Sequence, residues 1–353
     1  MSAGFLWGAA AAPDRIALCW RDRQVSYQEL HWHVARASAT PVPSAEASSV
    51  LGLETAVGFA PEPTLPHLVC LLAHAEQGVP CVLLHPRWPA PERQRALAEL
   101  PPITLRQPSP TLEHSLLRAD VSPASVGFAR ATFSEERALA VLFTSGSSSG
   151  AKAVVLSRRA FHAAANASAE RLGWQSDDRW LLSLPLAHVG GLSVLIRCLT
   201  AGQTVVLPDP EVALTTESLA RCIAEEAPTL LSLVPTQLSR LLGLSGWNLP
   251  RSVRAVLVGG ASCPPALVQE AMQRGWPLRR TYGMTETCAQ VATAHQDQAP
   301  GAALPLVAGV EARIQGGVIQ LKARSLLSAY VRTARSVQHS TLRAGSRRAI
   351  AAL

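Results

Sequence analysis

The sequence predicts an α/β fold in which parallel sheets are covered by helices. From residue 139 onward, short apolar runs of the length of buried strands recur, with helical segments between several of them. The runs are Leu139–Phe143, Ala153–Leu156, Trp180–Leu184, Thr204–Leu207, Thr229–Leu233 and Val253–Val258. The helical segments are Arg158–Leu172, His188–Thr200, Thr215–Glu226 and Pro235–Leu244. Alternation of this kind implies parallel strands, whose carboxyl ends are the usual place for ligands.

The first 130 residues are rich in Pro and Ala and carry weaker signals. Two apolar runs, Leu68–Leu72 and Cys81–Leu84, lie between loops, and residues 43–49 are typical of a surface loop. Ser26 and Glu29 have the spacing of a capping box at the start of a helix.

After the glycines at 316 and 317, the chain has two more strand-like runs, Val318–Lys322 and Leu326–Tyr330. Beyond Tyr330 the apolar periodicity fades into a basic stretch that we expect to pack against little. The sequence therefore predicts a main domain over residues 1–330 and an atypical basic tail over 331–353.

The composition is that of a globular protein, and residues 1–312 have no excess of basic side chains. Of 353 residues, 48% are hydrophobic and 16% are charged. Eight of the 32 basic residues follow Glu311, after which there is no acidic residue. The first 312 residues therefore hold 24 basic and 25 acidic side chains. Nucleic-acid binding needs clustered Lys and Arg on folded elements, so this distribution argues against it.

The cysteines and the first residues indicate a cytoplasmic protein. The seven cysteines are scattered, odd in number and form no C-x-x-C pair, which favours reduced thiols over a zinc site or a disulfide framework. The apolar start, residues 1–12, lacks basic residues and is interrupted by Asp14 and Arg15, so it suits neither a membrane span nor a signal peptide.

Residues 144–152, Thr-Ser-Gly-Ser-Ser-Ser-Gly-Ala-Lys, lie between two apolar runs and are suited to binding phosphate. Their small side chains allow consecutive backbone N–H groups to surround an anion, and hydroxyls can add donors. Lys152 can neutralise phosphate charge. The segment does not fit a Walker A loop, which has a second glycine five residues after the first, because the residue five positions after Gly146 is Ala151. A flexible Ser/Gly linker is the alternative, and the position between two buried strands favours the phosphate loop.

Three further segments have a structural and a functional interpretation. His188 follows an apolar run and begins a helical one, so it either caps the helix, sits in the core or serves a site. Gly259, Gly260 and Ala261 end a strand, as many strand exits do. The segment 280–287, Arg-Thr-Tyr-Gly-Met-Thr-Glu-Thr, reads by itself as a turn with a capping threonine and an acidic residue.

In combination, these segments resemble the signatures of the AMP-binding, adenylate-forming superfamily of acyl-CoA synthetases, luciferases and peptide-synthetase adenylation domains. The phosphate loop departs from the family pattern, which has Gly at Ser149 and Pro at Ala151. The resemblance covers about residues 13–330 and implies the large N-terminal domain of these enzymes, with parallel sheets, flanking helices and a smaller β-rich subdomain.

The resemblance also implies roles for individual residues toward ATP, Mg²⁺, CoA and an acid. The turn at Gly259, Gly260 and Ala261 would lie against adenine, and Tyr282 would stack on it beside Gly283 and Met284. Thr285 would lie near the α-phosphate, and Glu286 would bind Mg²⁺, for which a carboxylate oxygen is suited. His188 would line the acid pocket. The phosphate-binding residues would be Thr144, Ser145, Gly146, Ser147, Ser148, Gly150 and Lys152.

Within the superfamily, residues 184–195, 233–242 and 282–293 look most like o-succinylbenzoate–CoA ligases of menaquinone biosynthesis. The expected activity is therefore ATP-dependent formation of an acyl-CoA from a small carboxylic acid, with self-association possible. The family's Thr-Gly-Asp segment and its C-terminal domain with a mobile lysine have no counterpart after Tyr330. We therefore expect impaired activity. A ligase for another aryl or fatty acid, and a catalytically silent ATP- or acyl-adenylate-binding module or remnant, remain alternatives.

Overall fold

Two large mixed sheets and a small third one contain the strands. The computed structural model describes residues 12–38, 50–108, 133–144, 152–296, 298–331 and 348–349. The strands of the eight-stranded sheet are β1 Ile16–Trp20, β2 Arg23–Ser26, β8 Arg179–Leu181, β9 Thr204–Val206, β10 Leu230–Leu233, β11 Ala255–Val258, β12 Leu278–Met284 and β13 Ala289–Thr293. Those of the six-stranded sheet are β3 Val57–Phe59, β4 Cys81–Leu83, β5 Thr104–Arg106, β6 Ala138–Thr144, β7 Lys152–Ser157 and β16 Ala329–Val331.

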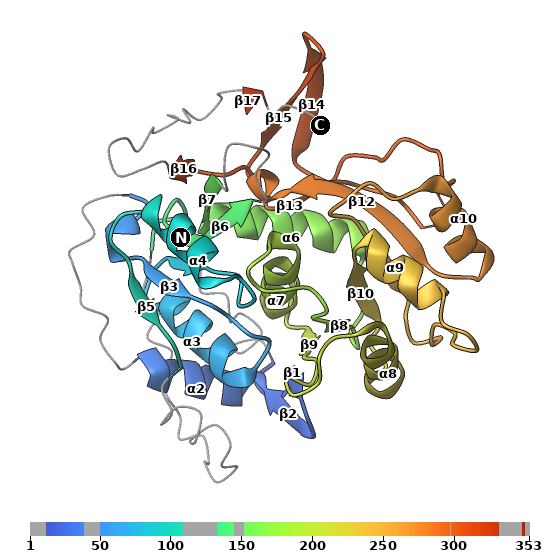
Figure 1. Ribbon diagram of the computed structural model, residues 1–353, viewed down its shortest axis with the longest axis horizontal. Helices are drawn as coiled ribbons and strands as arrows, with labels where there is room; N and C mark the ends of the chain where they lie inside the picture. The colour runs from blue at the N-terminus through green and yellow to red at the C-terminus, as the bar shows by residue number, and fades with distance from the viewer. Residues whose placement is uncertain are drawn as a thin grey trace.

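The strand orders are β13-β12-β11-β10-β8-β9-β1-β2 and β16-β7-β6-β4-β3-β5. The interior pairs of both sheets are parallel, as predicted, and antiparallel pairs adjoin them at β1–β2, β12–β13, β6–β7 and β7–β16. The third sheet projects from the body and contains β14 Val310–Gln315, β15 Val318–Ala323 and β17 Arg348–Ala349 (Figure 1). The predicted fold class is confirmed.

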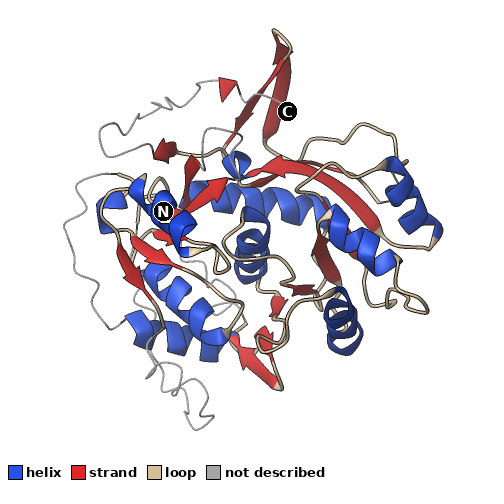
Figure 2. Ribbon diagram, in the orientation of Figure 1, coloured by secondary structure: helices blue, strands red, loops and turns tan. Residues whose placement is uncertain are grey.

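Helices cover the outer faces of both large sheets and fill the space between them (Figure 2). They are α2 Tyr27–Ser38, α3 Leu65–Glu76, α4 Ala90–Ala98, α6 Arg158–Leu172, α7 Val189–Ala201, α8 Thr216–Glu226, α9 Pro235–Leu242 and α10 Pro265–Gln273. Two short 3₁₀ helices are η1 Leu53–Thr55 and η2 Thr285–Thr287. None of the helices in the described ranges has the length and apolar character that a membrane span requires.

The alternating pattern of the strands in the two large sheets sorts side chains into separate hydrophobic cores. In β11, Ala255 and Leu257 join a central core with α2, α3, α6 and α7, whereas Val256 and Val258 face α8, α9 and α10. In β7, Val154 belongs to the central core and Val155 to the core beside α4. Because both faces of these strands are covered, they are apolar throughout, which made them recognisable in the sequence.

Several predicted boundaries differ from the structure for local reasons. The run Trp180–Leu184 forms a strand only to Leu181, because the Ser183 N–H donates back to the Leu181 carbonyl at 3.1 Å and not to a neighbouring strand. The run Leu68–Leu72 lies inside α3. Leu326–Tyr330 becomes extended only at Ala329.

The capping box predicted at the start of α2 is half formed. The Glu29 N–H donates to the Ser26 hydroxyl at 3.1 Å, as expected. The Glu29 carboxylate pairs instead with Arg23, at 2.5 Å. The predicted loop at 43–49 and nearly all of the basic tail lie outside the described residues.

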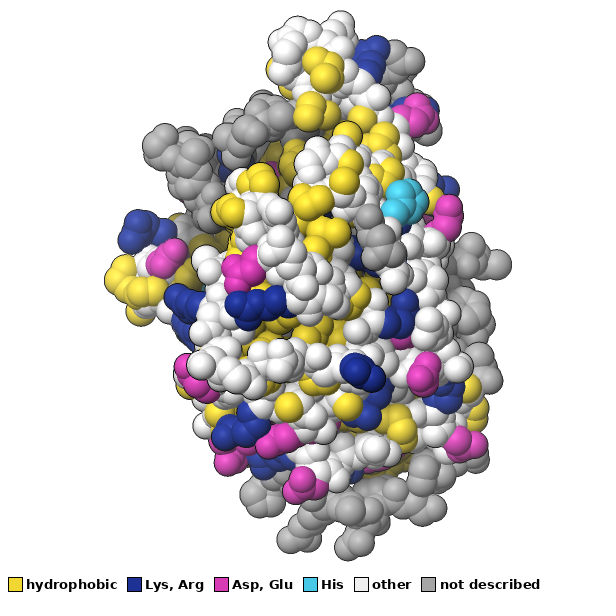
Figure 3. Space-filling model, turned by 90° about the vertical axis from the view of Figure 1, so that its right-hand side faces the viewer, with side chains coloured by type: hydrophobic (Ala, Val, Ile, Leu, Met, Phe, Trp, Pro, Cys, Tyr) yellow, Lys and Arg dark blue, Asp and Glu magenta, His cyan; other side chains and the backbone are white. Residues whose placement is uncertain are grey.

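Acidic and basic side chains are mixed on the face of the molecule that carries α8, α9 and α10 (Figure 3).

All seven cysteines are free thiols, and burial raises the pKa of Cys81, Cys198 and Cys288.

A buried carboxylate joins the amino ends of three parallel strands. Asp178 is 1% exposed and accepts hydrogen bonds from the Thr229 hydroxyl at 2.7 Å, Arg254 Nε at 2.7 Å and the Gln175 N–H at 2.8 Å. Burial by itself raises the pKa of Asp178, but the hydrogen bonds from Arg254, Gln175 and Thr229 outweigh it and lower that pKa below its usual value.

Replacing this carboxylate tests whether the network stabilises the fold. We expect Asp178→Asn to lower the free energy of unfolding by about 3 kcal/mol near neutral pH, because Arg254 loses its buried partner. Since the folded-state pKa of Asp178 is lowered, its contribution is complete above the unfolded value and is lost below about pH 4. Urea unfolding should therefore show the wild type and the variant converging as the pH falls. Glu270→Gln, in an exposed pair with Arg274, should change stability by less than about 1 kcal/mol at any pH.

Candidate nucleotide- and acid-binding site

A rigid turn follows β12 and carries Thr285 and Glu286. The Thr287 hydroxyl, which is buried, accepts from the Met284 N–H at 3.1 Å and donates to the Met284 carbonyl at 3.0 Å. Two consecutive non-glycine residues after the turn, Cys288 and Ala289, have φ values of 53° and 83°. Such values are sparsely populated by L-residues, so the surrounding contacts must hold this backbone in place.

Gly283 allows the two strands around this turn to approach each other closely. A Cβ atom added at Gly283 would lie 1.4 Å from the carbonyl oxygen of Ala289, and the β12–β13 register shifts between Tyr282 and Gly283. No other residue fits at this position without movement of the backbone. Glycine here is therefore a requirement of the fold and of the geometry of the turn.

The glycine turn after β11 lies beside this segment. A Cβ atom at Gly259 would lie 2.6 Å from Thr281 Cγ2 and 2.7 Å from the Thr281 carbonyl oxygen, so the two strand ends are in contact. Gly260 has a φ of 82°, in the region that favours glycine. Tyr282 is 38% exposed, and Ala261 is exposed. The structure thus brings together two of the predicted segments, and an aromatic ring is accessible beside them.

The predicted phosphate loop connects two strands of the other large sheet. Thr144 ends β6, Lys152 begins β7, and the two residues are paired across the antiparallel ladder. The residues between them, including the predicted Ser145, Gly146, Ser147, Ser148 and Gly150, lie outside the described residues. The Lys152 side chain is exposed and forms no ion pair within the described part of the chain.

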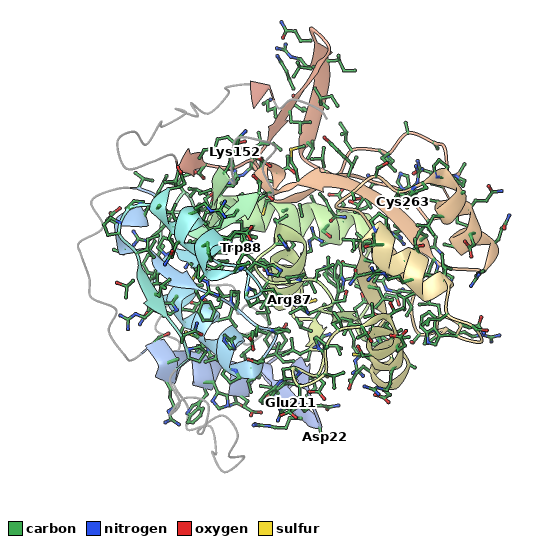
Figure 4. The ribbon with its side chains drawn as sticks, in the orientation of Figure 1. Asp22, Arg87, Trp88, Lys152, Glu211 and Cys263 are labelled. Carbon is green, nitrogen blue, oxygen red and sulfur yellow. The ribbon has the colours of Figure 1, made fainter. Side chains whose placement is uncertain are left out.

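Residues 327–330 bridge the two sheets at the site. The Leu327 N–H donates to the Glu286 carbonyl at 2.8 Å, and the Ser328 N–H donates to the Val155 carbonyl at 2.9 Å. The Tyr330 hydroxyl donates to Glu286 Oε1 at 3.1 Å, and Lys152 Nζ lies 5.9 Å from the centre of the Tyr330 ring. Lys152 is labelled in Figure 4, beside β7 and β16. Two residues that are 134 positions apart in sequence, Lys152 and Glu286, therefore meet at Tyr330.

The segment 85–88 contacts His188 through one of its rings and the end of β6 through another. His188 precedes α7 without capping it through its side chain, and its ring centre lies 5.2 Å from that of His85. Trp88, three residues after His85, packs edge-on against Phe143 at 5.4 Å, next to Thr144 (Figure 4). Desolvation lowers the pKa of both histidines, and the proximity of His188 contributes to the lowering at His85. Both rings are therefore neutral at pH 7.

Besides Tyr330, two residues were not predicted from the sequence as candidates for the site. His85 was passed over because it follows a short apolar run with no recognisable motif. Arg197 was passed over although a signal existed, since it is the one charged residue in the apolar helix α7.

Arg197 is an unusual cation for a protein core. It is 4% exposed, it lies over the Trp180 ring at 5.7 Å, and its Nε and Nη2 atoms have no hydrogen-bond partner among the described residues. Burial lowers the pKa of Arg197 to about 10, so it is still charged at neutral pH. The thiol of Cys288, directly after η2, is one of the groups that act on its charge. A buried guanidinium with unused donors is costly unless a ligand supplies an acceptor.

A known protein family matches most of the chain. The family model described as AMP-binding enzyme matches residues 5–317. The chain belongs to this family. Among curated relatives of this AMP-binding enzyme, the 2-succinylbenzoate–CoA ligase of Bacillus pumilus is 31% identical over 324 residues, which is 88% of this chain and 64% of the relative. That of Bacillus subtilis is 31% identical over 297 residues, or 81% of this chain and 59% of the relative. The chain thus spans about three fifths of the length of these two relatives.

Solved structures share the fold. The o-succinylbenzoate coenzyme A synthetase (MenE) of Bacillus subtilis in complex with AMP has a TM-score of 0.76 at 24% identity, covering 94% of this chain and 90% of that chain. A variant of MenE from E. coli with bound OSB-AMS has a TM-score of 0.77 at 26% identity, covering 99% of this chain and 75% of that chain. The first of these structures, a protein with the same fold, contains AMP.

The close contact at Gly283 provides a test of the site's architecture. Gly283→Ala should lower the free energy of unfolding by about 3 kcal/mol, because an added methyl group would overlap backbone of β13. Urea denaturation measures the change. Gly301→Ala is the matched control, since nothing lies within 4 Å of a Cβ atom there. Equal stability of the two variants would show that β12 and β13 are not in the contact described.

Proposed function

We propose that this AMP-binding enzyme activates o-succinylbenzoate with ATP, forming an acyl-adenylate and then the CoA thioester. The observation that carries the proposal is the meeting of Lys152 and Glu286 at Tyr330, together with the exposure of Tyr282, four residues before Glu286. The ends of the two sheets thereby carry a cation for phosphate, a carboxylate for a metal and an aromatic side chain for a base. The names of the relatives indicate the acid.

In the first half-reaction, a carboxylate oxygen of the acid attacks the α-phosphorus of ATP, and pyrophosphate leaves with the electrons of the broken P–O bond. Lys152 neutralises the negative charge that accumulates on the pyrophosphate, and the hydroxyl of Thr285 donates to an α-phosphate oxygen. Tyr282 holds the adenine by stacking while the glycine turn at 259–260 lets the ring approach the backbone. Catalysis by these groups consists of positioning and charge stabilisation.

Glu286 is suited to hold Mg²⁺. Its Oε1 accepts from the Tyr330 hydroxyl, and its carboxylate forms no ion pair within the described ranges, so acceptor capacity is left for a cation. When bound there, Mg²⁺ would supply positive charge that offsets the negative charge of the phosphates. In the second half-reaction, the thiol of CoA attacks the acyl carbon and AMP leaves.

The unused donors of Arg197 favour an acid with a second carboxylate. o-Succinylbenzoate has two carboxylates, of which only one reacts with ATP. Binding of the other one at Arg197 would satisfy a buried guanidinium through charge-assisted hydrogen bonds. A monocarboxylic acid would leave Arg197 without an acceptor, so the buried arginine supports o-succinylbenzoate over benzoate or a fatty acid.

Acid-dependent exchange between ATP and pyrophosphate tests the proposal. We expect exchange with o-succinylbenzoate and at least tenfold less with benzoate or a medium-chain fatty acid at equal concentration. In Arg197→Met, the KM for o-succinylbenzoate should rise about a hundredfold, because the variant loses the charged partner of one carboxylate. The free energy of unfolding of this variant should equal or exceed that of the wild type, since methionine replaces a buried charge.

The outcomes separate the alternatives. Exchange with benzoate or a fatty acid in preference to o-succinylbenzoate would assign another acid. ATP binding without exchange for any acid would indicate a nucleotide-binding module that does not adenylate. An unchanged KM in Arg197→Met would show that the arginine does not bind the acid. A cytoplasmic location and self-association remain predictions from the sequence.

A further inference from the structure

Tyr330 lies between the two charged side chains of the proposed site. Its backbone is held in β16, where it pairs with Val154 of β7, so the ring is carried by the same sheet as Lys152. Its hydroxyl reaches across to Glu286, which follows β12 of the other sheet, with a distance of 3.1 Å. Lys152 Nζ lies over the ring, 5.9 Å from its centre, within the range of a cation–π interaction.

Opposite charges that contact the same side chain present a problem for a binding site. If the Lys152 ammonium and the Glu286 carboxylate paired directly, each would neutralise the other, and binding of a phosphate or a metal would first require separating them. The two groups form no ion pair within the part of the chain that the structure describes. Each interacts instead with a different part of the tyrosine, the carboxylate with the hydroxyl and the ammonium with the ring face.

We infer that Tyr330 is a positioning residue that keeps Lys152 and Glu286 apart and orients the Glu286 carboxylate for a divalent cation. This inference rests on the proposed function, because it assigns an additional residue to the same nucleotide site. A hydrogen bond from a neutral hydroxyl restrains one carboxylate oxygen without neutralising the charge, and a cation–π contact restrains the ammonium likewise. Both charges then remain available, one to the metal and one to the phosphates.

The test uses equilibrium binding of ATP, measured by calorimetry with excess Mg²⁺ and again with the metal removed by a chelator. The ratio of the two affinities reports how strongly metal and nucleotide binding are coupled, and it needs no acid and no turnover. Tyr330→Phe should lower this ratio about tenfold, because it removes the hydrogen bond to a charged group. Its metal-free affinity for ATP should be unchanged, since the ring that supports Lys152 is kept. Tyr330→Ala should lower both the ratio and the metal-free affinity for ATP.

Tyr27→Phe is the matched control. The Tyr27 hydroxyl donates to the carbonyls of Gln203 and Cys198 in the core, at 2.7 and 3.1 Å, so its loss should lower the unfolding midpoint and leave the metal coupling as in the wild type. A wild-type coupling ratio in Tyr330→Phe, together with a reduced ratio in Glu286→Gln, would overturn the role of Tyr330 and leave the proposed function intact. A ratio unaffected by Glu286→Gln would overturn both the metal role of Glu286 and the inference built on it.

Discussion

The site depends on one short connection between the two large sheets. Each sheet carries part of the proposed nucleotide site: Lys152 begins a strand of one, and Glu286 follows a strand of the other. The segment 327–330 fixes their relative position, because its backbone bonds to Glu286 on one side and to Val155 on the other. Hydrogen bonds of this kind leave little freedom for the sheets to separate at this edge. Tyr330 then extends the connection from backbone to side chains.

A second constraint comes from the close approach of backbone segments. At both Gly259 and Gly283 an added Cβ atom would overlap a neighbouring segment of the chain. Gly259 directly follows β11, and Gly283 lies in β12, where it pairs with β13. The compact turn that results places Tyr282, Thr285 and Glu286 on a backbone that includes two left-handed non-glycine residues. Strained, tightly packed turns of this type hold functional groups more accurately than a flexible loop does.

Local sequence patterns identified most elements of the second half of the chain. The helix Arg158–Leu172 has the predicted bounds because Ser157 caps it and Gly173 follows it. The apolar strands were recognisable since both of their faces are buried. Family signatures indicated Lys152, His188, Tyr282 and Glu286, and the structure places the lysine, the tyrosine and the glutamate at neighbouring strand ends.

The residues that were not predicted act through tertiary contacts. Tyr330 appeared only as the end of an apolar run, and its bond to Glu286 joins residues that are distant in sequence. His85 becomes a candidate for the site only through its contact with the ring of His188. Arg197 could have been suspected as a charge in an apolar helix, but its unused donors are visible only when the neighbouring elements are in place. Short-range patterns cannot supply such information, because they describe elements and not how elements pack.

The central claim is that the ends of both sheets form a single nucleotide site, and MgATP binding to two single variants tests it most directly. Lys152→Ala alters only the six-stranded sheet, and Tyr282→Ala alters only the eight-stranded sheet. We predict that each variant binds MgATP at least tenfold more weakly than the wild type, with an unchanged unfolding midpoint. Wild-type affinity in either variant would contradict the account, because the nucleotide would then contact one sheet without the other.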